Sequence, residues 1–182
     1  PDANRAGPST LVKANDTHIL VDAGRGVVMR MAGADTLPLF LRAVLITHLH
    51  SDHICDLNDV ITTHWVMSQG NTPLAIYGPP GIQEFVTRQL HALEADIGYR
   101  IEHHDALTHG PKVNVVELAP GESFELDDVS VVHILSGPRA INVIPLVAFK
   151  IDNIKVCEKS ASEIDMSAES FLLTAARTKG VA

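Results

Sequence analysis

The stretch Ala43-Val44-Leu45-Ile46-Thr47-His48-Leu49-His50-Ser51-Asp52-His53 joins an apolar run to a cluster of three histidines and one aspartate. Neutral imidazole and carboxylate groups are the ligands that borderline cations such as zinc prefer. An apolar run that ends directly in such ligands is typical of a buried strand that delivers them to one place. The stretch therefore predicts a metal site at the end of a strand. A histidine cluster on a solvated loop is the alternative interpretation.

We call residues 47–53 the ligand cluster. In an extended segment the side chains of His48, His50 and Asp52 project to one side, and a turn into a following helix brings His53 to the same space. Four ligands so close in sequence would crowd one ion, whereas two ions about 3.5 to 4 Å apart can share them. We therefore expect one ion to be bound by His48 and His50. A second ion is expected at Asp52 and His53.

Hydrolysis is the reaction that such a pair of ions predicts. Bound ions lower the pKa of water towards about 7 and polarise the scissile group as Lewis acids. Asp52 is the candidate catalytic residue, because a carboxylate beside this water can orient it or accept its proton. The sequence does not separate that role from metal binding by the same side chain.

Bulk composition sets further expectations. The chain has 182 residues, 46% hydrophobic and 20% charged, and we expect a single domain over residues 1–182. The net charge of −8 repels a polyphosphate backbone, so nucleic acid is disfavoured as a partner. No stretch has the length of a transmembrane helix, and no membrane association is expected. Cys55 and Cys157 make no disulfide framework, which slightly favours the cytoplasm in an otherwise unknown localisation.

Periodicity predicts an alternation of strands and helices. In the first half, helical spacing of apolar residues predicts helices over 57–65 and 82–93. His64 lies at the edge of the first apolar stripe and is interpreted as a packed core histidine. A terminal helix is expected from Ser167. Strands are expected at 11–13, 18–22, 43–47, 74–77, 113–118, 129–134, 144–151 and 154–157.

Glycine-rich turns follow two of these strands, at residues 23–26 and 78–81. Both turns could bring backbone close to a site, or could be plain turn chemistry. A further histidine group, His103, His104 and His109, is interpreted as an exposed polar loop. Substrate contact by one of these histidines is the alternative.

The His-x-His-x-Asp-His pattern of the ligand cluster resembles that of the metallo-β-lactamase-fold hydrolases. Residues 18–24, His-Ile-Leu-Val-Asp-Ala-Gly, resemble that family's earlier strand, which ends in Asp-x-Gly and whose Asp supports the site without ligating. Residues 1–11 and 73–85 resemble the ribonuclease Z and arylsulfatase-like branch. The resemblance covers residues 1–135. It implies an α/β fold, a four-layer αββα sandwich incomplete at both termini, and two zinc ions, with manganese or iron as alternatives.

The family completes its site with a histidine after a mid-chain strand, an aspartate in a turn and a final histidine. His133 is the candidate for the first of these, although a histidine pointing into the sheet is the alternative. Glu158 and Asp165 are weaker candidates for the carboxylate. A truncated chain, a rebuilt site or a degenerate member would each explain this departure, and we expect a chain that extends beyond both ends.

The resemblance implies hydrolysis of an ester-type bond in a small-molecule substrate, such as a phosphodiester or a sulfate ester, through a metal-bound hydroxide. A non-catalytic metal-binding protein of the same fold with one structural ion is the first alternative. A tRNA 3′-processing endonuclease is a further alternative, weakened by the charge of −8 and by the lack of a basic glycine-rich insertion. A homodimer is left open.

Overall fold

A five-stranded mixed sheet forms the centre of the protein. The structure is a computed structural model that describes residues 6–14, 16–119, 122–126, 129–132 and 148–151. The strand order is β1-β2-β3-β4-β5. β1 is antiparallel to β2, and all other neighbouring strands are parallel. The strands are β1 (Thr10–Ala14), β2 (Thr17–Val21), β3 (Leu41–Leu45), β4 (Leu74–Gly78) and β5 (Val113–Glu117).

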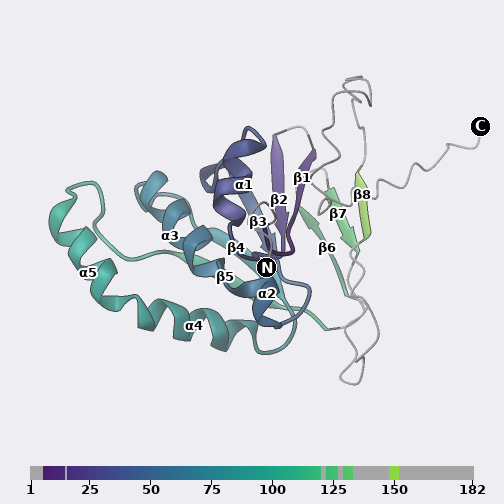
Figure 1. The fold of residues 1–182 in the computed structure, drawn as a ribbon. Helices are drawn as coiled ribbons and strands as arrows, with labels where there is room; N and C mark the ends of the chain where they lie inside the picture. Colours follow the sequence, from purple (N-terminus) through teal and green to yellow (C-terminus); the bar gives the residue numbers. More distant parts are fainter. Residues whose placement is uncertain (1–5, 15, 120–121, 127–128, 133–147, 152–182) are drawn as a thin grey trace, which may run out of the picture.

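Helices α1, α3 and α4 cover one face of this sheet, and α5 continues from α4 away from it (Figure 1). Leu20, Val44 and Ile76 on three adjacent strands share a buried core with Val60 and Ile61 of α3. The helical elements are α1 (Val27–Gly33), the 3-10 helix η1 (Pro38–Phe40), α2 (Ser51–Ile54), α3 (Leu57–Met67), α4 (Ile82–Ala92) and α5 (Glu94–His103).

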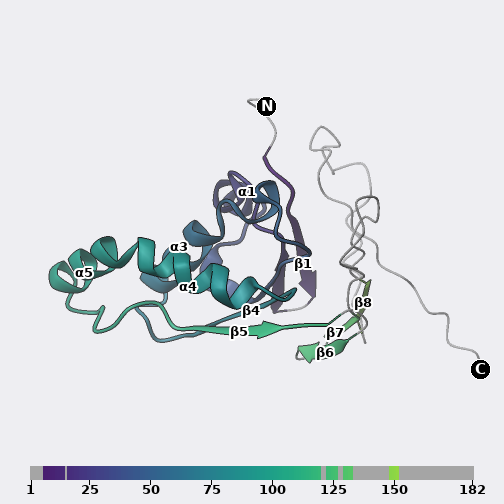
Figure 2. The same ribbon diagram turned by 90° about the horizontal axis from the view of Figure 1, so that it is seen from below.

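A second sheet packs on the opposite face of the main sheet, as Figure 2 shows from below. Its antiparallel order is β6-β7-β8, with β6 (Ser123–Leu126), β7 (Val129–Val132) and β8 (Ala148–Ile151). Ile19 and Leu45 of the main sheet share a core with Leu126. The rings of Tyr77 and Phe124 stack with centroids 3.9 Å apart. Because both faces of β2 and β3 are buried, these strands read as continuous apolar runs.

The predicted α/β class is confirmed, and the described residues supply one helical layer and two sheet layers. The strands expected in the first half are present within one or two residues at each end, as are the helices expected over 57–65 and 82–93. His64 is buried with 2% of its surface exposed, as predicted for a core histidine. The strand expected over 154–157, the terminal helix from Ser167 and the second helical layer lie outside the described residues.

Among the elements without a counterpart in the sequence prediction are α1, α5 and β6. α5 buries no residue, and its large apolar side chains are few, namely Ile97, Tyr99 and Ile101. α1 follows a glycine turn without an acidic residue in its first turn. β6 is four residues long. Because α5 ends at His103, the exposed loop expected there begins one residue later than predicted. No helix within the described segments has the length and apolar character needed to span a bilayer.

Candidate metal centre

The carboxyl ends of four parallel strands meet at one edge of the main sheet, which is where ligands bind in open α/β sheets. The segment after β3 contains the ligand cluster. The turn of residues 22–26 follows β2 on one side of it, and the turn of residues 78–81 follows β4 on the other. The ligand cluster therefore lies between two turns that the sequence marks with glycine.

The four candidate ligands of the ligand cluster lie next to one another. His48 Nε2 lies 3.0 Å from His50 Nδ1, and His53 Nε2 lies 3.7 Å from Asp52 Oδ2. The ring centroids of His48 and His53 are 4.0 Å apart, and those of His48 and His50 are 4.6 Å apart. His50 and Asp52 are exposed, whereas His48 and His53 are partly buried. Metal binding by these residues, and their division between two ions, stay predictions.

Imidazole nitrogen and carboxylate oxygen suit zinc. Among the residues that the structure describes, no three side chains of His, Cys, Asp or Glu are grouped as a site for one ion. His133, Glu158 and Asp165, which were considered as further ligands, lie outside the described residues.

Asp22, which directly follows β2, supports the ligand cluster through hydrogen bonds to Thr47 and His53. Its Oδ2 accepts a hydrogen bond from His53 Nδ1 at 2.7 Å. Its Oδ1 accepts one from the backbone N–H of Thr47 at 2.8 Å, and the Thr47 hydroxyl donates to Oδ2, also at 2.8 Å. Asp22 is buried. This arrangement agrees with the supporting, non-ligating role that the resemblance implies for Asp22.

These hydrogen bonds assign the tautomers of two histidines. Because the single proton of the Thr47 hydroxyl is donated to Asp22, its oxygen accepts from His48 Nδ1, 2.9 Å away. His53 Nδ1 likewise carries its proton towards Asp22. In both rings the other nitrogen, Nε2, is therefore left with a lone pair on the side of the ligand cluster. That is the form of histidine that binds a metal.

The two histidines differ in proton affinity. Burial, together with the nearby His53, lowers the pKa of His48, so this ring is neutral at pH 7. The hydrogen bond to Asp22 raises the pKa of His53. A metal ion at His53 must therefore compete with a proton as the pH falls.

Backbone contacts tie the turn of residues 22–26 to α2. Ala23 N donates to His53 O at 2.7 Å, and Asp56 N donates to Ala23 O at 3.0 Å. Asp56 Oδ2 accepts from Gly26 N at 2.6 Å. A Cβ atom on Gly24 would lie 2.6 Å from Asp52 O, so only glycine fits there. The functional interpretation of this turn is thus supported at Gly24. Asp56 was missed because nothing in its spacing marks it.

The turn of residues 78–81 supports the cluster from the other side. Gly81 has φ +100, and a Cβ atom there would lie 3.1 Å from Leu49 Cδ1, in the middle of the cluster. Glu117, at the end of β5, accepts hydrogen bonds at Oε1 from Gly81 N at 2.8 Å and Gln83 N at 3.2 Å. Glu117 was also missed, because a lone acid in a strand carries no local signal.

A ligand cluster of this pattern, at the edge of a sheet that packs against a second sheet, defines the class of metallo-β-lactamase-fold hydrolases. Comparison with known families agrees: residues 17–146 match the family model described as a beta-lactamase superfamily domain. The chain belongs to this family.

The chain is 48% identical over 154 residues to a protein named Ribonuclease Z from Mycobacterium sp. (strain KMS), a match that covers 84% of this chain and 53% of the relative. It is also 48% identical over 156 residues to Ribonuclease Z from Mycolicibacterium gilvum (strain PYR-GCK), covering 84% and 54%. The chain thus spans about half the length of the curated relatives it matches.

Two solved structures share the fold. The short form of human tRNase Z aligns with TM-score 0.58 and 22% identity, over 82% of this chain and 59% of that one. The metallo-beta-lactamase fold protein YhfI from Bacillus subtilis aligns with TM-score 0.55 and 23% identity, over 84% and 52%.

These comparisons correct one prediction. Nucleic acid was disfavoured as a partner because the chain carries a net charge of −8, yet relatives at 48% identity are named Ribonuclease Z. The inference was wrong because net charge sums over the whole chain, whereas a nucleic acid contacts one face. Local charge at that face decides the interaction.

Proposed function

We propose that the intact protein is a metal-dependent ribonuclease that hydrolyses phosphodiester bonds, with precursor tRNA as the first substrate to test. The observation that carries the proposal is the convergence of four donor side chains, in which His48 lies beside both His50 and His53, and His53 lies beside Asp52. The ribonuclease names of the 48% identical relatives support RNA as the substrate class.

The ligand set supports two divalent ions, with zinc as the first candidate. When bound, such ions supply Lewis acidity and lower the pKa of water. The protein's own residues orient this centre. Asp22 and Thr47 fix the rings of His53 and His48 with Nε2 towards the site. Asp52 is exposed beside His53 and can hold a proton from water as well as a metal.

One experiment separates this proposal from its alternatives. The full-length protein is assayed for metal content and for cleavage of precursor tRNA, bis(4-nitrophenyl) phosphate and 4-nitrophenyl sulfate. We expect two ions per chain and chelator-sensitive cleavage of the RNA. One tightly bound ion without turnover would support the structural-ion alternative and overturn the proposal. Turnover of a small ester without RNA cleavage would overturn the ribonuclease assignment.

Variants give this assay a matched comparison. His48→Ala removes a proposed ligand and is expected to lower the metal content and abolish cleavage. His91→Ala removes an exposed histidine on α4, which pairs only with Glu94 at 3.5 Å, and is expected to change neither. An equal loss of bound metal in both variants would mean that metal binding depends on the number of histidines in the protein and not on the ligand cluster.

A further inference from the structure

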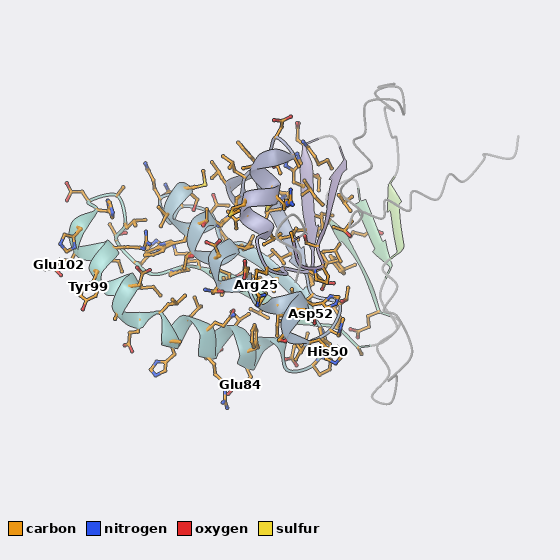
Figure 3. The ribbon with its side chains drawn as sticks, viewed as in Figure 1. Arg25, His50, Asp52, Glu84, Tyr99 and Glu102 are labelled. Atoms are coloured by element: carbon orange, nitrogen blue, oxygen red, sulfur yellow. The ribbon has the colours of Figure 1, made fainter. Side chains whose placement is uncertain are left out.

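We infer that Arg25 binds a phosphate group of the RNA beside the metal centre, an inference that rests on the proposed function. Arg25 lies in the turn of residues 22–26, whose backbone packs against α2. Figure 3 shows Arg25 at the same end of the molecule as His50 and Asp52, whereas Tyr99 and Glu102 lie at the far end, on α5.

The backbone on both sides of Arg25 is held in place. Gly24 packs so closely that a Cβ atom would lie 2.6 Å from Asp52 O. Gly26 N donates to Asp56 Oδ2 at 2.6 Å, and Arg25 O accepts from Gly7 N at 2.8 Å. Gly24 contacts the backbone of the ligand cluster. The Arg25 side chain therefore projects from a fixed backbone position one residue after that contact.

The other arginines in the described part of the chain already have interactions. Arg88 pairs with Glu84 at 2.6 Å on α4, and Arg100 pairs with Asp96 at 2.8 Å on α5. Lys13 Nζ donates to Ala34 O at 3.3 Å. The Arg25 side chain is exposed and, within the described ranges, has no ion pair or side-chain hydrogen bond. Its guanidinium thus keeps all its donors for a ligand.

Stability does not explain an arginine at this position. Arg25 precedes Gly26, the N-cap of α1. A positive charge next to a helix N-terminus is unfavourable, and an acidic residue there would stabilise the helix. A guanidinium, by contrast, matches phosphate oxygens with two parallel N–H donors. In a chain with a charge of −8, one free arginine at the rim of the site gives RNA a local cation.

RNA binding in a full-length Asp52→Ala background, in which the RNA is not cut, tests this inference. Arg25→Ala is expected to weaken binding about threefold to tenfold at low salt and to reduce the salt-dependence slope by about 1. Arg25→Lys keeps the charge and should restore most of that slope. Arg88→Ala makes the same change in net charge and should leave affinity and slope unaltered.

The readouts also separate this inference from the proposed function. Because the Arg25 side chain has no partner among the residues that the structure describes, Arg25→Ala in the otherwise unmodified protein should not lower the melting temperature. Equal RNA affinity of the Arg25→Ala and Arg88→Ala variants would overturn the inference, and so would a lowered melting temperature that Arg25→Lys rescues without restoring binding. Absence of RNA cleavage by the unmodified protein, with binding still dependent on Arg25, would overturn the proposed function alone.

Discussion

Asp22 and His53 are joined by a hydrogen bond of 2.7 Å between Oδ2 and Nδ1, although 31 positions separate them in the sequence. Asp22 ends the second strand and adopts φ +61, a left-handed conformation that non-glycine residues rarely take. That conformation turns the carboxylate towards both Thr47 and His53. The hydrogen bond is what presents Nε2 of His53 to the proposed metal.

Asp22→Asn tests this orientation. Asparagine tolerates the left-handed conformation, so the backbone should be retained. The asparagine amide has a single acceptor oxygen, which can accept hydrogen bonds from Thr47. Its NH₂ group is a donor and cannot accept a hydrogen bond from His53 Nδ1. We expect zinc affinity, measured by competition with a chromogenic chelator, to fall about 10-fold to 100-fold.

Asp59→Asn is the matched control. Asp59 Oδ1 accepts from Thr63 Oγ1 at 3.1 Å on the exposed side of α3. The same substitution there should leave zinc affinity unchanged. Unaltered affinity in Asp22→Asn would show that Asp22 has no part in orienting His53.

Gly24→Ala should displace the ligand cluster. The new Cβ atom would lie 2.6 Å from the carbonyl oxygens of both Asp52 and Pro8, which are backbone atoms that cannot rotate away. We expect the free energy of unfolding to fall by about 2 kcal/mol or more. The zinc content per chain, measured on the same protein, should fall as well. Urea unfolding and metal analysis measure the two effects.

The matched control is Gly33→Ala, at the end of α1, where no atom lies within 4 Å of the new Cβ. Alanine there should leave stability equal or slightly higher, because it restricts the unfolded chain. If Gly24→Ala were as stable as Gly33→Ala and bound as much zinc, the close approach of this turn to α2 would contribute neither to stability nor to metal binding.

The sequence predicted the parts of this fold that carry a periodic apolar pattern. Strands with both faces buried, such as β3, and helices with a clear stripe, such as α3, were expected within about two residues. α5 was missed because it buries no residue and its large apolar side chains are few. Periodicity detects burial, not secondary structure itself.

In the candidate site, too, the features that depend on local sequence were predicted and those that depend on long-range contacts were not. His48, His50, Asp52 and His53 lie within six residues of sequence, and their convergence was predicted from local spacing. The contacts of Asp56 with Gly26 and of Glu117 with Gly81 join segments 30 and 36 positions apart. Such contacts depend on which strands are neighbours in the sheet, and a single sequence does not encode that order locally. Arg25 was likewise seen only as part of a turn.

Stability should depend on pH through His64. Burial lowers the pKa of this histidine in the folded protein, and its Nε2 has no hydrogen-bond partner among the described residues. The unfolded chain therefore binds a proton near pH 6.5 that the folded protein does not bind until lower pH. The stability that depends on neutral His64 is present above pH 6.5 and decreases as the pH falls below it.

His64→Met removes this group while keeping an apolar side chain in the core. The difference in unfolding free energy between this variant and the unmodified protein, measured in urea at pH 7.5 and pH 5.5, should favour the variant more at the lower pH. Comparing the two proteins cancels the opposite contribution of His53, whose pKa is raised. A difference that is the same at both pH values would contradict the prediction.

Glu117 should stabilise the start of α4 and, through it, the turn that contacts Leu49. Glu117→Ala leaves the N–H groups of Gly81 and Gln83 without their acceptor. We expect a loss of about 0.5 to 1 kcal/mol in unfolding free energy, as at other helix N-termini, and faster hydrogen exchange at both amides.

Glu117→Gln keeps an acceptor oxygen and should lose less unfolding free energy. Glu84→Ala, in the same helical turn, breaks only the exposed pair with Arg88 and should leave both amides protected. Unchanged exchange at Gly81 in Glu117→Ala would show that water replaces the carboxylate there, and that other contacts, such as the hydrogen bond from Leu118 N to Gly78 O, hold the turn beside the ligand cluster.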